Sequence, residues 1–475
     1  MSTFGALNTA FTGLSAARAA MNTAGQNIAN ANTEGYTRQR VTTSAAGAPA
    51  NVGLAASNRP AAGQGVNVDA IARLGNAFAD FRVRTAAAQA GYSSARAEAL
   101  SAIETNLHEP GADGISSQLH TFWANWGAVA NQPDSEAVAS VLLENASVLT
   151  GKIAAGYAAL ETQWATTRGT VDTMAAELNS SASQVAALNG QIRSTQAAGG
   201  SANELIDQRA KLVTSIASLA GGTVRDNSDG TLDVVVGGNA IVSGTTHRPV
   251  VVTGASRLDD TAGSPVRLEW ANRPGQAVAM DSGRLAGTLS VLAPASGASG
   301  EATGGAIAEA AKAYDEFATT LATTVNTAHQ NGSTRSGATG TDFFIVLPGA
   351  HPALTVAVKP TNASELASGR PGAGAYDGSN ADLISQVGTA EGSPDEAWST
   401  FVTSTGVAVK SELLHSSFDE AASAAAAQAQ VSGAGVDFDE ENVNILAAQR
   451  AYQAAARVMS AIDEALDVLI NRTGL

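Results

Sequence analysis

Residues 445–469 read ILAAQRAYQAAARVMSAIDEALDVL, and apolar side chains recur along this stretch at alternating spacings of three and four. Residues three and four apart share one face of a helix, so the pattern predicts a helix with an apolar seam of the coiled-coil type. Asp437, three residues before Glu440, predicts a capped first turn for this helix. The predicted seam consists of Ile445, Ala448, Tyr452, Ala455, Met459, Ile462, Leu466 and Leu469.

The other end of the chain repeats this pattern, with Arg18 and Gly25 as interruptions, and predicts a helix from residue 1 to about residue 34. A seam of this kind is more often the core of one chain than an interface between chains. Here such a core would have to join the two extremes of the chain. We therefore expect the terminal helices to pair and also to form an assembly interface. The N-terminal seam consists of Phe4, Leu7, Phe11, Leu14, Met21 and Ile28.

The segment that follows the first helix, NIANANTEGYTRQR at residues 27–40, is too polar to be core. Its three asparagines are read either as ordinary loop and cap residues or as side chains that fix a tight helix exit by bonding to the backbone. We expect Gly35 to supply a positive φ, and Tyr36 and Arg38 to contact a neighbouring subunit. The candidate residues of this segment are Asn27, Asn30, Asn32, Thr33, Gly35, Tyr36, Arg38 and Gln39.

Between the ends, the first part of the chain is predicted to be a linker and then helices. Residues 42–67, rich in Ala, Gly, Pro and Ser, predict an extended linker. The longest regular element is expected over residues 153–192, where apolar spacing alternates without a slip and gives a rod of roughly 60 Å. A further helix is expected over residues 202–220, ended by Gly221. The helix expected directly after the linker places on one face Ile71, Leu74, Phe78, Phe81 and Tyr92.

The pattern changes at Thr223. An Asp-Gly pair at 229–230 with the β-branched run behind it predicts a hairpin, and strand-like pieces continue to about Leu289. Helices are expected again over about 307–328 and 395–430, with loops and a few strands in 332–400. The predicted fold is mainly α with an inserted β domain, and its long helices resemble coiled coils. The predicted domains are a terminal helical assembly domain (1–70 and 431–475), a rod-like helical domain (71–222 and 299–430) and an inserted β domain (223–298).

The 475-residue chain has a formal net charge of −16 and contains no cysteine. The acidic balance argues against a nucleic-acid partner, because phosphate neutralisation needs a basic face. The lack of cysteine excludes disulfides and thiolate metal sites. We expect no cleavable secretory signal and no membrane-spanning stretch. No metalloprotease, phosphate-loop, dinucleotide, calcium or nucleophile pattern is complete, so we expect no catalysis, no metal and no cofactor.

The segment from Asn27 to Tyr36 resembles the signature shared by flagellar rod, hook and hook-associated proteins. With Thr37, Arg38 and Gln39 it is more similar to the members at the hook–filament junction than to rod or hook subunits. Glu34 departs from the resemblance, because junction proteins often carry proline there. The resemblance continues over residues 435–472 and at interior points, namely NELIDQRAKLV (203–213), the region of Asp229-Gly230, and VNTAHQNG with DFF (325–344).

This resemblance implies a structural subunit of the bacterial flagellum that joins hook to filament, is located outside the cell and is cytoplasmic before export. It also implies export of the unfolded chain by the type III apparatus and assembly into a ring with other copies. The implied partners are the hook protein, hook-associated protein 3 and an export chaperone at the C-terminal region. We expect the terminal helices to be mobile in the monomer and to fold on assembly. The alternatives are a hook or distal-rod subunit and, more weakly, an enzyme carried on an axial scaffold.

Overall fold

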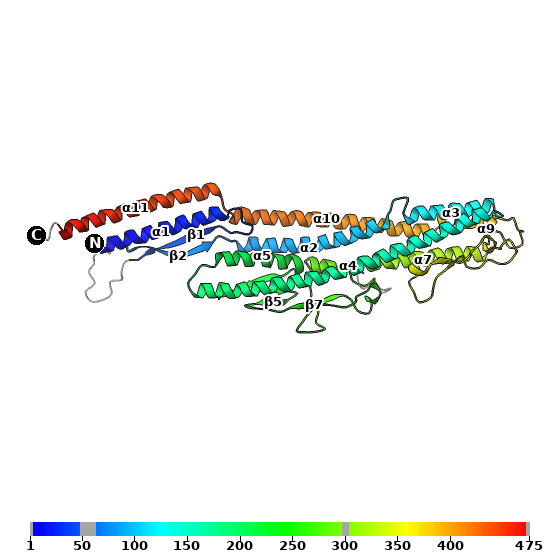
Figure 1. Ribbon diagram of the computed structural model, residues 1–475, viewed down its shortest axis with the longest axis horizontal. Coiled ribbons are helices and arrows are strands. Elements are labelled where there is room, and N and C mark those ends of the chain that lie inside the picture. The colour runs from blue at the N-terminus through cyan, green and yellow to red at the C-terminus, as the bar shows by residue number, and fades with distance from the viewer. Residues whose placement is uncertain (1–2, 48–62, 297–303, 472–475) are drawn as a thin grey trace.

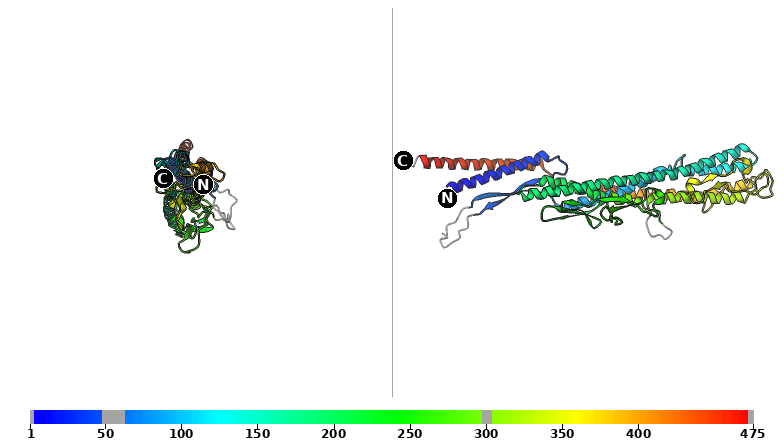
Figure 2. Two further views of the ribbon diagram at one scale, coloured as in Figure 1. Left: turned by 90° about the vertical axis from the view of Figure 1, so that its right-hand side faces the viewer. Right: turned by 60° about the horizontal axis from the view of Figure 1, so that its bottom comes forward.

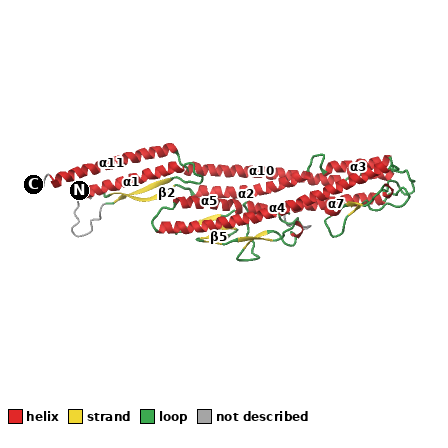
Figure 3. Ribbon diagram, in the orientation of Figure 1, coloured by secondary structure: helices red, strands yellow, loops and turns green. Residues whose placement is uncertain are grey.

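The computed structural model describes residues 3–47, 63–296 and 304–471. Long helices run along one axis of an elongated molecule, and both termini lie at the same end (Figure 1). Strands are confined to a ribbon near the termini, a lobe on one side, and a short pair toward the other end (Figure 3). The predicted class, mainly α with inserted β, is confirmed.

The terminal end, which we call the terminal unit, consists of two helices and a two-stranded ribbon. Its helices lie side by side and antiparallel (Figures 1 and 2), so the predicted pairing is confirmed. The side chains of Phe4 and Leu469 lie outside the described residues. The elements of the terminal unit are α1 (Thr3–Asn30), β1 (Gln39–Ala46), β2 (Gly65–Arg73) and α11 (Phe438–Asn471).

The predicted linker over 42–67 is wrong at both of its ends. β1 and β2 pair antiparallel with Gln39 opposite Arg73 and Ala46 opposite Gly65, so the chain forms a ribbon beside α1. Small and β-branched residues suit a half-exposed ribbon as well as a linker, and composition does not separate the two. The middle of the predicted linker, residues 48–62, lies outside the described residues.

The body of the molecule, which we call the rod, is built on the 62-residue helix α4. The helix predicted over 153–192 is confirmed and is longer in both directions. Most of its predicted seam is buried, with Trp164 at 0% and Tyr157 at 1% exposure. The main helices of the rod are α2 (Ala77–Leu107), α3 (Ile115–Asn131), α4 (Glu136–Ala197), α5 (Asn203–Ala220), α6 (Arg284–Val291), α7 (Ala306–Gln330) and α10 (Pro394–Ala434).

Two expected boundaries in the rod are corrected. The helix expected from Ile71 begins at Ala77, because Ile71 pairs in β2 and the side chain of Asn76 caps the helix by accepting from the N–H groups of Phe78 and Ala79. Phe78 and Phe81 are exposed on this helix rather than buried. The strands do not reach Leu289, since α6 occupies that region and packs on α2.

Among the described helices, α4 alone is long and apolar enough to cross a membrane by length and composition, although no such stretch is expected from the sequence. Its predicted seam is buried inside the rod, against α3, α5 and α7. That packing is typical of a core helix, which meets the same criteria of length and apolarity.

The inserted β region, which we call the β lobe, lies along α4. The turn predicted at Asp229-Gly230 joins the first two strands and is confirmed, with Gly230 at φ 82°. Asn189 of α4 is fully buried and bonds to the backbone of Leu232 and Gly244, which fixes the lobe on the helix. The elements of the lobe are β3 (Thr223–Asp226), β4 (Leu232–Val236), β5 (Asn239–Ser243), β6 (Thr246–His247), β7 (Val250–Thr253), η1 (Leu258–Asp260) and β8 (Arg267–Trp270).

The end of the rod away from the termini carries loops with short elements, as predicted for 332–400. An aromatic group of Phe122, Trp126, Phe343 and Phe344 forms its core, with ring centroids of Trp126 and Phe343 5.2 Å apart. The short elements are β9 (Phe344–Ile345), α8 (Pro352–Thr355), β10 (Ala357–Val358), η2 (Ala363–Glu365), α9 (Ser379–Ser385) and η3 (Val387–Thr389).

These loops are expected to loosen in acid through His329. The ring is fully buried, bonds to the carbonyl oxygen of Thr341, and accepts from the N–H of Ala367 at 2.9 Å, so it is neutral. Burial lowers the pKa of His329 below its usual 6.5. The unfolded state therefore binds more protons below that pH, and stability is lost by at most about 1.4 kcal/mol per pH unit as pH falls. Amide exchange near residues 341 and 367 measures this, and in His329→Gln the acid sensitivity should disappear. Unchanged sensitivity in that variant would contradict the prediction.

Candidate assembly site

The exit of α1 is organised by the side chain of Asn27, which is 1% exposed. Its Nδ2 donates to the carbonyl of Gln39 at 2.9 Å, and the Gln39 N–H donates back to its Oδ1 at 3.0 Å. The side chain thus imitates a neighbouring strand for the start of β1. Tyr36 donates its hydroxyl to the same Oδ1 at 2.9 Å. The predicted bonding of an asparagine side chain to the backbone is confirmed at Asn27.

The turn after α1 uses the remaining residues of the polar segment. Asn30 Nδ2 donates to the carbonyl of Gln26, and Thr33 Oγ1 donates to Asn30 Oδ1. Asn32 is exposed. Gly35 has φ 82°, so the positive φ expected there is confirmed. The chain reverses here and returns along α1 as β1.

Replacing Gly35 by alanine is expected to cost the terminal unit about 1 kcal/mol, because the left-handed region disfavours residues with a Cβ by about 1–2 kcal/mol. An added Cβ would meet nothing within 4 Å, so the cost is conformational. Gly25→Ala is the matched control, since Gly25 lies in α1 with open space and alanine there should stabilise the helix by up to about 1 kcal/mol. Amide exchange in α1 measures both variants, and effects of the same sign would count against this account.

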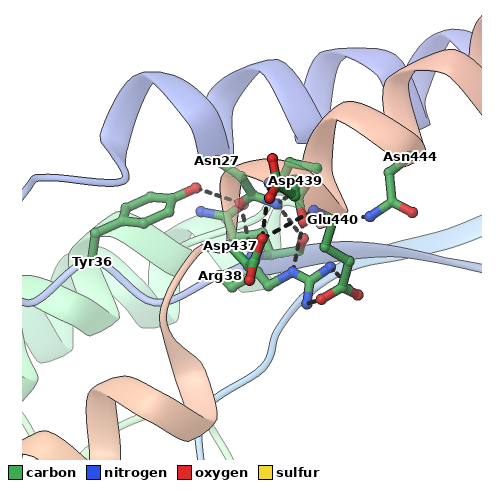
Figure 4. A network of polar contacts seen from close by, with 9 residues as sticks. Asn27, Tyr36, Arg38, Asp437, Asp439, Glu440 and Asn444 are labelled. Atoms are coloured by element: carbon green, nitrogen blue, oxygen red, sulfur yellow. Dashed lines mark hydrogen bonds and ion pairs between the residues drawn. The ribbon is translucent and has the colours of Figure 1, made fainter.

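Arg38 joins the N-terminal segment to the start of α11 (Figure 4). Its Nε donates to Glu441 Oε1 at 2.7 Å, and its two terminal nitrogens donate to the two oxygens of Glu440 at 2.8 and 2.7 Å. Glu441 is 2% exposed and also accepts from Asn27. The N-terminus of a helix stabilises carboxylates, so α11 presents these acids without repulsion from its own backbone.

The predicted cap of α11 is confirmed. Asp437 Oδ1 accepts from the N–H groups of Asp439 at 2.8 Å and Glu440 at 3.1 Å. The backbone N–H of Arg38 donates to Ala434 at the end of α10. The polar segment therefore contacts both sides of the α10–α11 junction.

A third partner, α5, was missed by the sequence analysis as part of this site. Asp207 accepts from the N–H of Thr37 at 3.0 Å and from Arg73 Nε at 2.6 Å. Glu204 accepts from the side-chain amide of Gln39 at 3.0 Å. The available signal was the polar, charged character of NELIDQR, in which Asn203, Asp207 and Arg209 are buried despite their polarity. These residues together form what we call the polar cluster, namely Asn27, Tyr36, Thr37, Arg38, Gln39, Glu204, Asp207 and Glu441.

Three carboxylates surround Tyr36 and act on its hydroxyl. Burial, together with the charges of Glu204, Asp207 and Glu441, raises the pKa of Tyr36 to about 12. The hydroxyl therefore stays protonated at neutral pH and can act as the donor to Asn27. Tyr36 and Arg38 make these contacts within the chain, and their expected contact with a neighbouring subunit stays a prediction.

The two predicted seams differ in how much of them is buried. On α11, Ala448 is buried and most of the other seam positions are half-buried, with Tyr452 at 36% exposure. On α1 the large side chains are half-buried, and Phe11 is 59% exposed. The residues buried along α1 are smaller, namely Ala10, Ala17, Thr23, Ala24 and Asn27.

Within the residues that the structure describes, no group of three or more His, Asp or Glu side chains could hold a metal ion. The polar cluster is built of ion pairs and hydrogen bonds that satisfy each other. Such a site fixes the relative positions of helices.

Three family models match the chain. The flagellar hook-associated protein FlgK helical domain matches residues 100–344. The flagella basal body rod protein model matches residues 7–37, and the flagellar basal body rod FlgEFG protein C-terminal model matches residues 427–472. The two shorter matches fall on the terminal unit, and the longer one falls on the rod and the β lobe.

Curated relatives and a solved structure agree with these matches. The chain is 29% identical over 507 residues to flagellar hook-associated protein 1 of Bacillus subtilis, covering 100% of this chain and 99% of that protein. It is 27% identical over 355 residues to the protein of the same name in Escherichia coli, covering 72% of this chain and 60% of the relative. The fold is similar to the flagellar hook junction protein FlgK from Burkholderia pseudomallei, with a TM-score of 0.63, 14% identity, and coverage of 73% of this chain and 99% of that one.

Proposed function

The chain belongs to the family of flagellar hook-associated protein FlgK, and from this premise we propose that it joins hook to filament by assembling through its terminal unit. It is a structural component of the extracellular flagellum. The observation that carries the proposal is the polar cluster. It holds α1, α11 and α5 together, so that both ends of a long chain form one surface at one end of the molecule.

The surface of the terminal unit supports assembly through it. Large apolar side chains are exposed on both helices, which a protein that remained alone would bury or replace. In the flagellum they would be covered by neighbouring subunits. The exposed side chains are Phe11, Phe438, Val443, Leu446, Tyr452, Val458 and Val468.

The partners follow from this role. We propose that other copies of the chain complete a ring, with the hook protein on one side of it and hook-associated protein 3 on the other. An export chaperone would cover the C-terminal helix beforehand. The chain would pass the type III apparatus unfolded, with residues 1–70 and 431–475 acting as the assembly domain and the β lobe facing outward.

We also propose that the terminal unit is marginal in the monomer and gains stability on assembly. Among its described side chains, the fully buried ones on α11 are Glu441 and Ala448. Burial of alanine contributes little against the roughly 1–2 kcal/mol of backbone entropy lost per ordered residue. Limited proteolysis of the monomer measures this, since α1 and α11 should be cleaved before α4. Equal protection of the termini and α4 would contradict the proposal.

A clean deletion tests the function itself. Electron microscopy should show hooks without filaments, and flagellin should appear in the medium, because filament subunits would be exported with nothing to attach to. Loss of the hook as well would move the chain to the rod or hook. Normal filaments would overturn the proposed role. The family is structural, which supports a role without catalysis.

A further inference from the structure

A groove of about 450 Å³ lies in the terminal unit between α1, β1 and α11. Its helical walls are made of very small side chains, so a third helix could approach both backbones closely. The third side of the groove is the start of β1, at residues 38–41. The small residues that line these walls include Gly13, Ala16, Ala20, Ala447, Ala448 and Ala451.

A second observation indicates that the groove receives something. Thr23 lines it, is 6% exposed, and has an Oγ1 with no hydrogen-bond partner among the described residues. A buried hydroxyl is normally paired, because leaving it unpaired is unfavourable. The same end of the groove carries Asn444 and Glu441, with Glu440, 58% exposed, next to them in the first turn of α11. The groove is thus apolar along its length and polar at one end.

The free face of α1 has the complementary order of side chains. Asn8, Phe11, Ser15, Arg18 and Asn22 are all exposed and follow one another at spacings of three and four, so they share one face of the helix. Phe11 is the large apolar side chain of this face, and Arg18 is the charged residue of α1. An aromatic ring, a hydroxyl and a cation therefore follow each other along one line.

We propose that α1 of a second copy lies in this groove, antiparallel to α11, with Phe11 against Ala448, Ser15 beside Thr23 and Asn444, and Arg18 beside Glu440. This inference rests on the proposed function and assigns the contact between copies to the free face of α1 and the groove of the terminal unit. The registers agree to within one residue, because Phe11, Ser15 and Arg18 are separated by steps of four and three, and positions 448, 444 and 440 by steps of four and four. At 1.5 Å per residue the third position lies about 10 Å along α1 and about 12 Å along α11, a difference that the length of the Arg18 side chain spans.

Each element of the groove then has a function. Phe11 fills the part lined by alanine, and the hydroxyl of Ser15 reaches the level of the unpaired Thr23. Arg18 joins Arg38 as a second cation at Glu440, whose side chain is 58% exposed. Within one chain, Asn27 of α1 lies opposite Glu441 of α11. Relative to that α1, the α1 of the second copy is displaced along the axis by nine residues, about 13 Å. The knob, which is the side chain of Phe11, and the groove lie on different surfaces of the same chain. Such a contact is heterologous and generates rings or helical arrays rather than closed dimers.

Disulfide trapping in assembled flagella tests this proposal, and a chain without cysteine gives no background. Cells that also make the natural chain would produce two single-cysteine variants, Phe11→Cys and Ala448→Cys, so that assembly does not depend on either. Because disulfides need Cβ atoms roughly 4 Å apart, mild oxidation of isolated flagella should give at least about tenfold more 11–448 dimer than a control pair. The control pair is Phe11→Cys with Val458→Cys, which lies on α11 outside the groove and is 50% exposed.

A second pair keeps the test decisive if cysteine at Phe11 or Ala448 prevents incorporation. Ser15→Cys with Asn444→Cys leaves the knob and the wall intact and should cross-link to the same extent. Mass spectrometry of cysteine peptides shows whether both variants are present in the flagella. Both present without dimers, or dimers as abundant in the control pair, would overturn the proposal while leaving the junction role intact. Absence of the natural chain from the hook–filament junction would instead overturn the proposed function.

Discussion

Replacing Arg38 by alanine is expected to release α11 from the rest of the chain, at a cost of about 3–5 kcal/mol to the terminal unit. The reason is the carboxylate left behind. Glu441 is 2% exposed and would keep only the hydrogen bonds of Asn27 and Asn444 in place of the guanidinium at 2.7 Å. A buried charge without its partner costs more than the pair contributes. Amide exchange over residues 438–450 would rise, and electron microscopy should show hooks that have lost their filaments.

Two variants separate this effect from loss of surface charge. Arg38→Lys keeps the charge but cannot bond Glu440 and Glu441 together through one planar fork, so it should fall between alanine and the natural residue. Glu440→Gln changes an acid whose side chain is 58% exposed and should have a small effect on amide exchange over residues 438–450. Alanine and glutamine variants that behaved alike would show that Arg38 acts through general surface charge and not through the buried acid.

The rod could be predicted from the sequence because its pattern is local. Along α4 the apolar side chains are spaced alternately by three and four residues, so they share one face of the helix. That face packs into the core, as Trp164 and Val171 show at 0% exposure. The hairpin at Asp229-Gly230 is also local, since the turn residues and the strand that follows determine it. Both predictions needed only residues close together in the chain.

The terminal unit could be predicted only in part, because its packing depends on which neighbour is present. The spacing of Phe11, Leu14 and Met21 predicted the helix, but α11 and the ribbon cover a face of α1 on which Ala10, Ala17 and Ala24 are buried. Small residues carry little hydrophobic signal, yet they permit the closest approach of two helices. The larger side chains remain available to other copies.

The polar cluster could not be assembled from the sequence for a different reason. Arg38 and Glu441 are 403 positions apart, and Thr37 and Asp207 are 170 apart. The sequence around a charged residue does not show which opposite charge it pairs with, so one chain allows many equivalent pairings. The polar segment at 27–40 could be recognised as exceptional, but its partners on α5 and α11 required the fold.

Replacing Asn189 by alanine is expected to detach the β lobe from the rod, with a loss of about 3–5 kcal/mol, since each buried group left unsatisfied costs about 1–3 kcal/mol. Asn189 is fully buried and holds three parts together. Its amide donates to Leu232 at 2.7 Å and Gly244 at 2.6 Å, and its oxygen accepts from Arg209 at 2.8 Å. Burial lowers the pKa of Arg209, but the guanidinium stays charged and would keep Gly230 as its remaining partner.

Amide exchange over residues 232–244 measures this loss, and Gln184→Ala is the matched control. Gln184 lies on the same helix, is exposed, and bonds only to Ser180 among the described residues, so its removal should stay within about 0.5 kcal/mol. Exchange along α1 and α11 should not change in either variant, because the polar cluster contacts α5 at Glu204 and Asp207, on the N-terminal side of Arg209. If opening the lobe also opened the terminal unit, α5 would transmit changes between them, and Asp207 and Arg209 could not be treated as independent anchors.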